Sequence, residues 1–388
     1  MTFVMLMAVT VVVFADDVTL YSDDTETTET DTEGKLCYNE DGTFTILMIN
    51  DTQDVGKCVN SKMLDFVEAS IIEADPDLVV LDGDQLADIY PFATAKDIKL
   101  AIDNVCSILE EYQIPFLVTL GNHDHDRESV VSEAEQYAIY TSYSMCYNVY
   151  ADEMEGDYFT CALPIYSSDG STIQFAVFVI DSNNTSGSDY IGDTAEQVEW
   201  YIEESEKLNE EAGTTVPVIL FQHIPVNEIY TTGLMQKCSW NTDGAIYSRR
   251  DSSWYILADG VEGELGEAPC SEPIGEGAGM YDAWVEQGNI IGAWFAHDHV
   301  NTFSGVDDNG ILMGYNGGCG FRAYGNGDER TTRVFNFTEG DEENYSTSLI
   351  YYDEVCGSLL FVISDILTPE WLTWIMKPIY ALFGWMMD

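Results

Sequence analysis

The chain has 388 residues, of which 69 are Asp or Glu and only 14 are Lys or Arg, giving a formal net charge of −55. A surface this acidic repels polyanions, so we expect no nucleic-acid partner unless a bound metal reverses the field locally. The hydrophobic content of 46% is that of a globular protein, and the length allows one large catalytic domain with tails or two modest domains.

The first 43 residues divide into two segments. Residues 1–15 contain an apolar stretch without charges, Phe3 to Phe14, which is followed by small residues before Asp16. This pattern predicts a signal peptide and therefore a secreted or extracellular protein, associated in one alternative with the cell surface. A buried N-terminal strand is the other interpretation of the segment. Residues 16–43 are rich in Asp, Glu and Thr, and they predict an acidic, disordered linker.

Residues 44–337 alternate short apolar runs with helical patterns, which predicts one continuous α/β domain. The runs are apolar throughout, which is typical of strands that are buried on both faces of a sheet. In chain order we expect strand Phe44–Ile49, helix Lys62–Glu73 capped by Ser61, strand Leu78–Leu81, helix Ala95–Tyr112, strand Pro115–Leu120, strand Gln174–Ile180, helix Ala195–Asn209, strand Val216–Phe221, helix Met280–Gln287 and strand Ile290–Phe295.

Polar residues follow five of these strands at the point where each strand ends. The carboxyl ends of strands meet at one edge of an open α/β sheet, so these residues are expected to converge. All five histidines of the chain lie in these polar segments, together with Asp and Asn residues; they are His123, His125, His223, His297 and His299. Imidazole combined with carboxylate and amide oxygens suits Mn, Fe or Zn.

The order of these segments resembles the calcineurin-like metallophosphoesterases. The matching motifs are Asp-x-Gln, Gly-Asp, Gly-Asn-His-Asp, a lone His after a strand, and x-His-x-His. The segments Gln222–Pro225 and Ala296–Asn301, and the glycine-rich loop Gly314–Gly325, are most similar to the branch called purple acid phosphatase 29-like. The resemblance implies an α/β fold in which two mixed sheets flanked by helices form a four-layer α/β/β/α sandwich.

The resemblance also implies two divalent or trivalent metal ions, Mn, Fe or Zn, that share Asp84. It assigns Asp51, Gln53 and His299 to the first ion, and Asn122, His223 and His297 to the second. A hydroxide between the ions would attack phosphorus in line. His123 would donate a proton to the leaving oxygen, and Asp124 would orient its imidazole. The implied substrate is a small phosphorylated molecule or a phosphoprotein, and a phosphomonoester in preference to a diester.

Three positions depart from the family pattern. Gln53 stands where the family commonly has His, and an amide oxygen is a weaker and harder ligand than imidazole. Ala87 stands where purple acid phosphatases have a colour-giving Tyr, which argues against a purple ferric centre. Ala296 replaces the usual Gly before His297, and this change is mild if the backbone φ is negative.

Other polar residues near the motifs have two interpretations each. His125 either contacts substrate or is solvated. Arg127 and Arg322 either grip a phosphate or form surface salt bridges. A second function class is a catalytically silent, metal-binding protein of the cell surface. His123 argues against this class, because an inert metal site has no use for a histidine that is not a ligand.

The nine cysteines form no CxxC pair, so a structural zinc site is not expected. If the chain is exported, we expect a disulfide between Cys146 and Cys161, whereas Cys106 is expected in the core. Glycosylation sequons begin at Asn184 and Asn336.

Residues 338–388 predict a C-terminal extension. Its apolar tail, Leu359 to Met387, is interrupted by charged residues and proline, so it falls short of a spanning helix. The tail either docks on the domain as short helices or contacts a membrane surface or a partner. Substrate selectivity is expected in the loops Ile139–Tyr158 and Ile229–Gly277.

Overall fold

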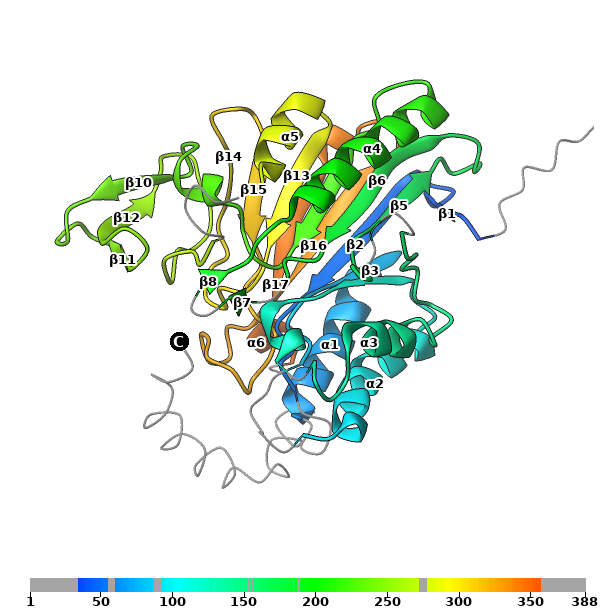
Figure 1. The fold of residues 1–388 in the computed structure, drawn as a ribbon, viewed down its shortest axis with the longest axis horizontal. Helices are drawn as coiled ribbons and strands as arrows, with labels where there is room; N and C mark the ends of the chain where they lie inside the picture. Colours follow the sequence, from blue (N-terminus) through cyan, green and yellow to red (C-terminus); the bar gives the residue numbers. More distant parts are fainter. Residues whose placement is uncertain are drawn as a thin grey trace, which may run out of the picture. The chain divides into compact units, whose positions relative to one another are not determined.

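Two mixed β-sheets pack face to face at the centre of the fold (Figure 1). The computed structural model describes residues 34–54, 60–86, 93–126, 128–151, 154, 156–183, 185–186, 189–271 and 278–356, all within the compact unit Thr32–Asp388. The predicted signal peptide, most of the predicted linker and the apolar tail lie outside the described residues, so these assignments stay predictions.

The first sheet has five strands in the order β17-β16-β2-β3-β4. Their bounds are β2 Thr43–Ile49, β3 Leu78–Asp82, β4 Phe116–Thr119, β16 Thr331–Thr338 and β17 Ser346–Tyr351. Strands β2, β3 and β4 run parallel, and β16 is antiparallel to β2 and to β17. The carboxyl ends of β2, β3 and β4 therefore meet at one edge.

The second sheet has seven strands in the order β1-β5-β6-β9-β13-β15-β14. Their bounds are β1 Leu36–Cys37, β5 Cys161–Tyr166, β6 Ile173–Ile180, β9 Val218–Gln222, β13 Ile290–Phe295, β14 Ser304–Val306 and β15 Leu312–Tyr315. Strands β6, β9, β13 and β15 are parallel neighbours, so their carboxyl ends also share an edge.

Helices cover the outer face of each sheet (Figure 1). The five-stranded sheet is covered by α1 Ser61–Ala74, α2 Ala95–Glu111, α3 Glu133–Tyr140 and α6 Tyr352–Val355. The seven-stranded sheet is covered by α4 Ala195–Ala212 and α5 Met280–Gln287. Small additions are the sheets β7 Thr185–Ser186 with β8 Asp189–Tyr190 and β10 Met235–Cys238 with β11 Ile246–Ser248 and β12 Ser253–Leu257, and the 3-10 turns η2 Asn122–His125, η3 Asn227–Tyr230 and η4 Glu342–Asn344.

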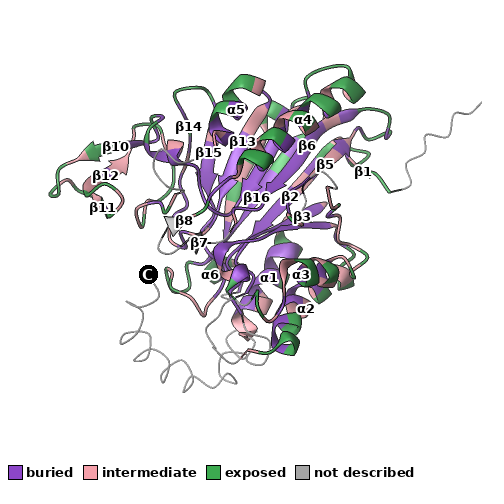
Figure 2. Cartoon of the chain, viewed as in Figure 1, coloured by how far each residue is buried: buried purple, intermediate pink, exposed green. Residues whose placement is uncertain are grey.

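The central strands are apolar on both sides because both of their faces are covered. In β2, Leu47 and Ile49 pack under the helices of their own sheet, whereas Ile46 and Met48 pack against the other sheet. Side chains alternate between faces along a strand, so a strand between two cores must be apolar at every position. Figure 2 shows the buried interior of both sheets between partly exposed helices. The predicted four-layer sandwich is confirmed.

Local differences from the predicted elements have simple causes. Asn60, and not Ser61, caps α1, because its side-chain oxygen accepts a hydrogen bond from the Lys62 amide at 3.0 Å. The small sheet β10–β12 was not predicted, because it is half exposed and lacks a long apolar run. The two large sheets extend beyond the predicted limits of 44 and 337, since β1 and β17 lie outside them.

The predicted disulfide between Cys146 and Cys161 is wrong, because both cysteines are free thiols. Each sulfur lies instead near the Asn148 side chain, at 3.7 Å from Oδ1 for Cys146 and 3.5 Å from Nδ2 for Cys161. Cys106 is fully buried among the apolar residues under α2, as predicted.

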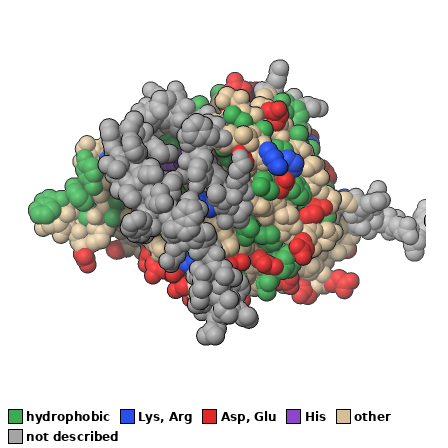
Figure 3. All heavy atoms as spheres, turned by 90° about the horizontal axis from the view of Figure 1, so that it is seen from below, with side chains coloured by type: hydrophobic (Ala, Val, Ile, Leu, Met, Phe, Trp, Pro, Cys, Tyr) green, Lys and Arg blue, Asp and Glu red, His purple; other side chains and the backbone are tan. Residues whose placement is uncertain are grey.

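Within the described residues, no helix is both long enough and apolar enough to span a bilayer. On the face drawn in Figure 3, acidic side chains outnumber basic ones among the described residues.

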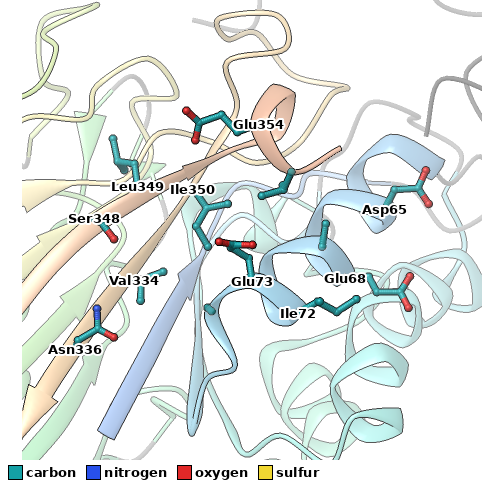
Figure 4. A pocket seen from close by; sticks show the side chains of 13 residues that line it. Asp65, Glu68, Ile72, Glu73, Val334, Asn336, Ser348, Leu349, Ile350 and Glu354 are labelled. Atoms are coloured by element: carbon teal, nitrogen blue, oxygen red, sulfur yellow. The ribbon is translucent and has the colours of Figure 1, made fainter. Parts of the chain in front are cut away.

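A groove of about 690 Å³ lies between α1 and the β16–β17 edge, lined among others by Ile72, Glu73 and Leu349 (Figure 4). This groove shares no residue with the strand-end clusters, so the functional site is elsewhere.

Candidate metal centre

Both sheets contribute side chains to one buried cluster at their joint. The five-stranded sheet places Asp51 after β2, Asp84 after β3 and Asn122 after β4. The seven-stranded sheet places His223 after β9, and His297 and His299 after β13. Potential ligand atoms of Asp84, His223 and His297 lie within 4.8 Å of one another, and so do those of Asp51, Asp84 and His299. Asp84 is common to both sets.

Buried polar atoms of this cluster have no hydrogen-bond partner. They are Asp51 Oδ1, Asn122 Oδ1, His223 Nε2 and His297 Nδ1. A buried polar atom without a partner costs about 1–3 kcal/mol, so these atoms need an explanation. Three of the four residues, Asp51, His223 and His297, have ligand atoms close to Asp84. Bound cations would satisfy these atoms, and the oxygen and imidazole donors fit first-row transition metals.

Two of the imidazoles have their tautomer fixed by a backbone carbonyl. His223 Nδ1 donates to the Asp82 carbonyl at 2.8 Å, and His299 Nδ1 donates to the Tyr324 carbonyl at 2.9 Å. A neutral ring then presents Nε2 as a lone pair. The Nε2 atom of His299 lies 2.9 Å from Asp51 Oδ1, and that of His223 lies 3.2 Å from Asp84 Oδ2. Burial opposes the charged form of both rings, but the neighbouring Asp84 and Asp51 outweigh it and raise the pKa of His223 and of His299, so without a metal a proton on Nε2 joins each pair. A metal ion between the two atoms would replace that proton.

Part of the backbone at the cluster is in the left-handed conformation, which residues other than glycine rarely adopt. Eight non-glycine residues of the described chain have such a φ, and four of them lie at the cluster: Asp51, Gln53, Asp84 and His297. Such residues cost free energy and concentrate at functional sites. Their gathering at one sheet edge supports a functional role for this edge.

Glycine at position 83 allows the two sheets to approach closely. Gly83 has φ +76°, and a Cβ atom there would lie 2.5 Å from Nδ1 of His223. No larger residue fits without moving the imidazole, which explains the glycine of the Gly-Asp motif.

Gln53 lies in the cluster with its amide directed at the shared carboxylate. Its Nε2 donates to Asp84 Oδ2 at 3.0 Å. The other oxygen of Asp84 accepts from the backbone amide of His123 at 2.8 Å. Gln53 is therefore placed with the other predicted ligands, although the amide is turned so that its nitrogen and not its oxygen contacts the carboxylate.

The carboxylate beside His123 differs from the predicted one. Nδ1 of His123 lies 2.6 Å from Asp126 Oδ2. Asp124 instead accepts hydrogen bonds from the backbone amides of Leu86 and Gly121, both at 2.8 Å, and so holds two loops together. The carboxylate that contacts the ring of His123 is therefore Asp126, whereas Asp124 binds backbone amides.

Charges inside the cluster shift the pKa values of its members. Burial opposes the charged form of Asp84, but the neighbouring His223 and His123 outweigh it and lower the pKa of this carboxyl. Burial, together with repulsion from His223, lowers the pKa of His297 to about 3. A neutral His297 and an ionised Asp84 are the protonation states that metal ligation requires.

The structure places His125, Arg322 and Ala296, three positions near the motifs whose roles the sequence leaves open. His125 is buried beside Asp181, so the expectation that it is solvated is wrong, whereas contact with substrate stays a prediction. Arg322 forms an ion pair with buried Asp54, with Nε 2.8 Å from Oδ1, which supports the salt-bridge interpretation. Ala296 keeps a non-positive φ, and His297 takes the left-handed conformation, so the change from Gly is mild. Arg127, Ala87 and the Asn184 sequon lie outside the described residues.

Supporting residues were not identified from the sequence. Asn50 donates to Asp51 Oδ2 at 2.6 Å, and the Tyr324 ring stacks on His299 with centroids 4.3 Å apart. Tyr324 lies in the glycine-rich loop that carries part of the resemblance, which was the available signal for it. Asn50 directly precedes a predicted ligand, but nothing in the sequence indicates the direction of its amide.

The fold and the donor atoms together define a metal-binding α/β sandwich protein with its site at the strand ends. The family model of the calcineurin-like phosphoesterases matches residues 44–301, which is more than half of the chain, and the chain belongs to this family. The family is one of metal-dependent phosphoesterases, so the resemblance noted in the sequence is confirmed.

Curated relatives share this family. The chain is 25% identical over 328 residues to "Probable inactive purple acid phosphatase 14" of Arabidopsis thaliana, covering 75% of this chain and 74% of the relative. It is 25% identical over 325 residues to "Probable inactive purple acid phosphatase 28" of the same plant, with the same coverages. Among solved structures, a putative 5'-nucleotidase from Staphylococcus aureus in complex with alpha-ketoglutarate aligns with a TM-score of 0.45 and 10% identity, covering 80% of this chain and 54% of that one.

Proposed function

We propose that this protein hydrolyses phosphate monoesters with the help of two metal ions held at the joint of the sheets. One observation carries the proposal: ligand atoms of Asp51, His223, His297 and His299 gather around the carboxylate of Asp84, and three of these residues have a buried polar atom without a hydrogen-bond partner. The proposed ligands of the first ion are Asp51, Gln53 and His299, those of the second are Asn122, His223 and His297, and Asp84 is shared.

His123 would supply the proton that the leaving oxygen of the substrate needs. When bound, a pair of metal ions lowers the pKa of water and neutralises phosphate charge. His123 is not among the proposed ligands, and its side chain is 32% exposed. Since Nδ1 contacts Asp126, Nε2 is available to donate a proton to the leaving oxygen. In the metal-free protein, burial opposes the charged form of His123, but Asp84 and Asp126 outweigh it and raise its pKa to about 9.

A second candidate is a metal-binding protein without catalytic activity. The observation that favours it is the word "inactive" in the names of both curated relatives. The partly exposed imidazole of His123 contacts the carboxylate of Asp126 beside the donor cluster. This arrangement favours the enzyme, because a silent site does not need a positioned proton donor.

A hydrolysis assay with metal analysis separates the two candidates. We expect the Mn-loaded protein to cleave para-nitrophenyl phosphate faster than bis(para-nitrophenyl) phosphate. His123→Ala should keep its metal and lose about 100-fold or more in kcat, as is usual for a general acid, and Asp84→Asn should lose metal and activity together. Asp169→Asn serves as the control, since this carboxylate accepts hydrogen bonds from Ser167 and Ser171 in the turn between β5 and β6.

Three results would each contradict one part of the proposal. Metal bound at full stoichiometry without hydrolysis above the protein-free rate would favour the silent protein. Equal kcat for wild type and His123→Ala would remove the proposed proton donor. A faster reaction with the diester would refute the preference for monoesters alone.

A further inference from the structure

A second group of carboxylates lies beside η2, apart from the donor cluster. Glu133 begins α3, Asp157 precedes β5, and Asp181 follows β6. One carboxylate oxygen of each lies within 4.8 Å of the other two. Three carboxylates from distant parts of the chain at this separation repel one another strongly in a partly buried place.

His125 is directed at this group and has no hydrogen-bond partner. Only 7% of the residue is exposed, and its Nε2 is among the buried polar atoms without a partner. This nitrogen lies 3.6 Å from Oδ1 of Asp181, which is too long for a hydrogen bond. Two ligand atoms that are each about 2.1 Å from one ion lie roughly this far apart.

The carboxylates are held in place by backbone amides. Glu133 Oε1 accepts from the Tyr158 amide at 2.9 Å, and Asp181 Oδ1 accepts from the Asn183 amide at 2.9 Å. Asp157 Oδ1 accepts from the amides of residues 159 and 160 at 3.1 and 2.9 Å. The three side chains are thus positioned without the help of any bound cation.

Apart from His125, no basic side chain pairs with this group within the part of the chain that the structure describes. The ion pairs that Lys and Arg form there involve other acids, and only the imidazole of His125 approaches Asp181. Burial and the neighbouring Asp181 raise the pKa of Glu133 to about 8, which reflects the same lack of positive charge.

We propose that Glu133, Asp157, Asp181 and His125 bind a third metal ion, a divalent first-row transition metal such as Mn²⁺ or Zn²⁺. An imidazole among the donors disfavours Ca²⁺ and Mg²⁺, which prefer all-oxygen sites. The ion would tie η2, which also carries Asn122 and His123, to the start of α3 and the end of β6. This role is structural and does not depend on hydrolysis.

Metal counting on the full chain tests the proposal. Protein loaded with Mn²⁺, and in parallel with Zn²⁺, is dialysed, and the metal per chain is measured by inductively coupled plasma mass spectrometry. We expect three ions in the wild type and two in Asp181→Asn and in His125→Gln. Asp84→Asn should lose ions of the shared pair and keep the third, and Asp169→Asn should keep three. Circular dichroism verifies that each variant is folded.

Defined results overturn or support the third site. A wild-type count that Asp181→Asn does not lower would overturn it, and would mean that His125 pairs with Asp181 as an imidazolium. A count lowered by Asp181→Asn but not by His125→Gln would remove the imidazole from the proposed ligands. An ion that Asp181→Asn loses and Asp84→Asn keeps would support the site even if the shared pair does not bind.

Discussion

At the scale of single residues, the contact between His123 and Asp126 shows what sequence reasoning can and cannot supply. In a 3-10 turn the residues i and i+3 are eclipsed, so His123 and Asp126 lie on one side, whereas Asp124 points elsewhere. The sequence predicted a histidine supported by a carboxylate. It could not select Asp126, because the 3-10 geometry of the turn was not predicted.

Replacing Asp126 by Asn should lower the pKa of His123. In the metal-free protein this pKa is about 9, raised above the usual 6.5 by Asp84 and Asp126 against the opposing effect of burial. The protonated ring is stabilised below that value and loses its proton as pH rises through it. Without the Asp126 carboxylate the imidazole should lose its proton at lower pH, which NMR titration of the ring signals measures.

Asp169→Asn is the control for this titration. Its carboxylate accepts hydrogen bonds from Ser167 and Ser171 in the turn that precedes β6. An unchanged His123 pKa in Asp126→Asn would show that the 2.6 Å contact does not support the imidazolium.

The proposed metal ligands could be predicted from the sequence for a physical reason. A buried strand that ends in Asp, Asn or His leaves polar groups at a sheet edge, where they need a partner. That rule indicated Asp51, Asp84, Asn122, His223, His297 and His299. The structure brings ligand atoms of five of them together, and the sixth, Asn122, has a buried side-chain oxygen without a hydrogen-bond partner. His125 follows the same pattern in sequence, yet its ring turns to Asp181, because a 3-10 turn directs successive side chains to different sides.

At the scale of elements, the turns after the strands matter more than the strands themselves. The long apolar strands and helices were predicted because their patterns are strong. The cap at Asn60 and the strands β10–β12 were not, because caps depend on one side-chain hydrogen bond and short exposed strands carry weak patterns.

Gly83→Ala tests the turn after β3. At φ +76° the new Cβ is strained and lies 2.5 Å from Nδ1 of His223, so the variant should lose about 2 kcal/mol or more of unfolding free energy and bind metal more weakly. Chemical denaturation and metal counting measure the two effects.

Gly213→Ala provides the matched control. This residue caps α4 with φ +71° and has nothing within 4 Å of the added Cβ. It should lose only about 1 kcal/mol, the cost of the left-handed conformation, and bind metal normally. Equal losses in the two variants would mean that the contact with His223 is unimportant.

At the scale of the whole molecule, the donor cluster joins two sheets. Three of its members follow strands of the five-stranded sheet, and three follow strands of the seven-stranded sheet. An ion that binds only the folded arrangement stabilises it by about 2.7 kcal/mol when its free concentration is 100 times Kd.

Removing metal should therefore lower the melting temperature of the entire domain. A chelator should destabilise the Mn-loaded wild type in calorimetry, and the decrease should be smaller in Asp84→Asn, which lacks the shared ligand. A decrease of equal size in both proteins would show that the cluster does not couple metal binding to folding.

The chain order of the two sheets has one more consequence. Asp51, Asp84 and Asn122 come from the first third of the sequence, and His223, His297 and His299 from the remainder, with the segment between α3 and β5 separating them. A polypeptide cut in that segment would yield two fragments, each with an incomplete coordination shell. Reassociation of such fragments would regenerate the ligand set, so the protein could serve as a split reporter whose signal is metal capture.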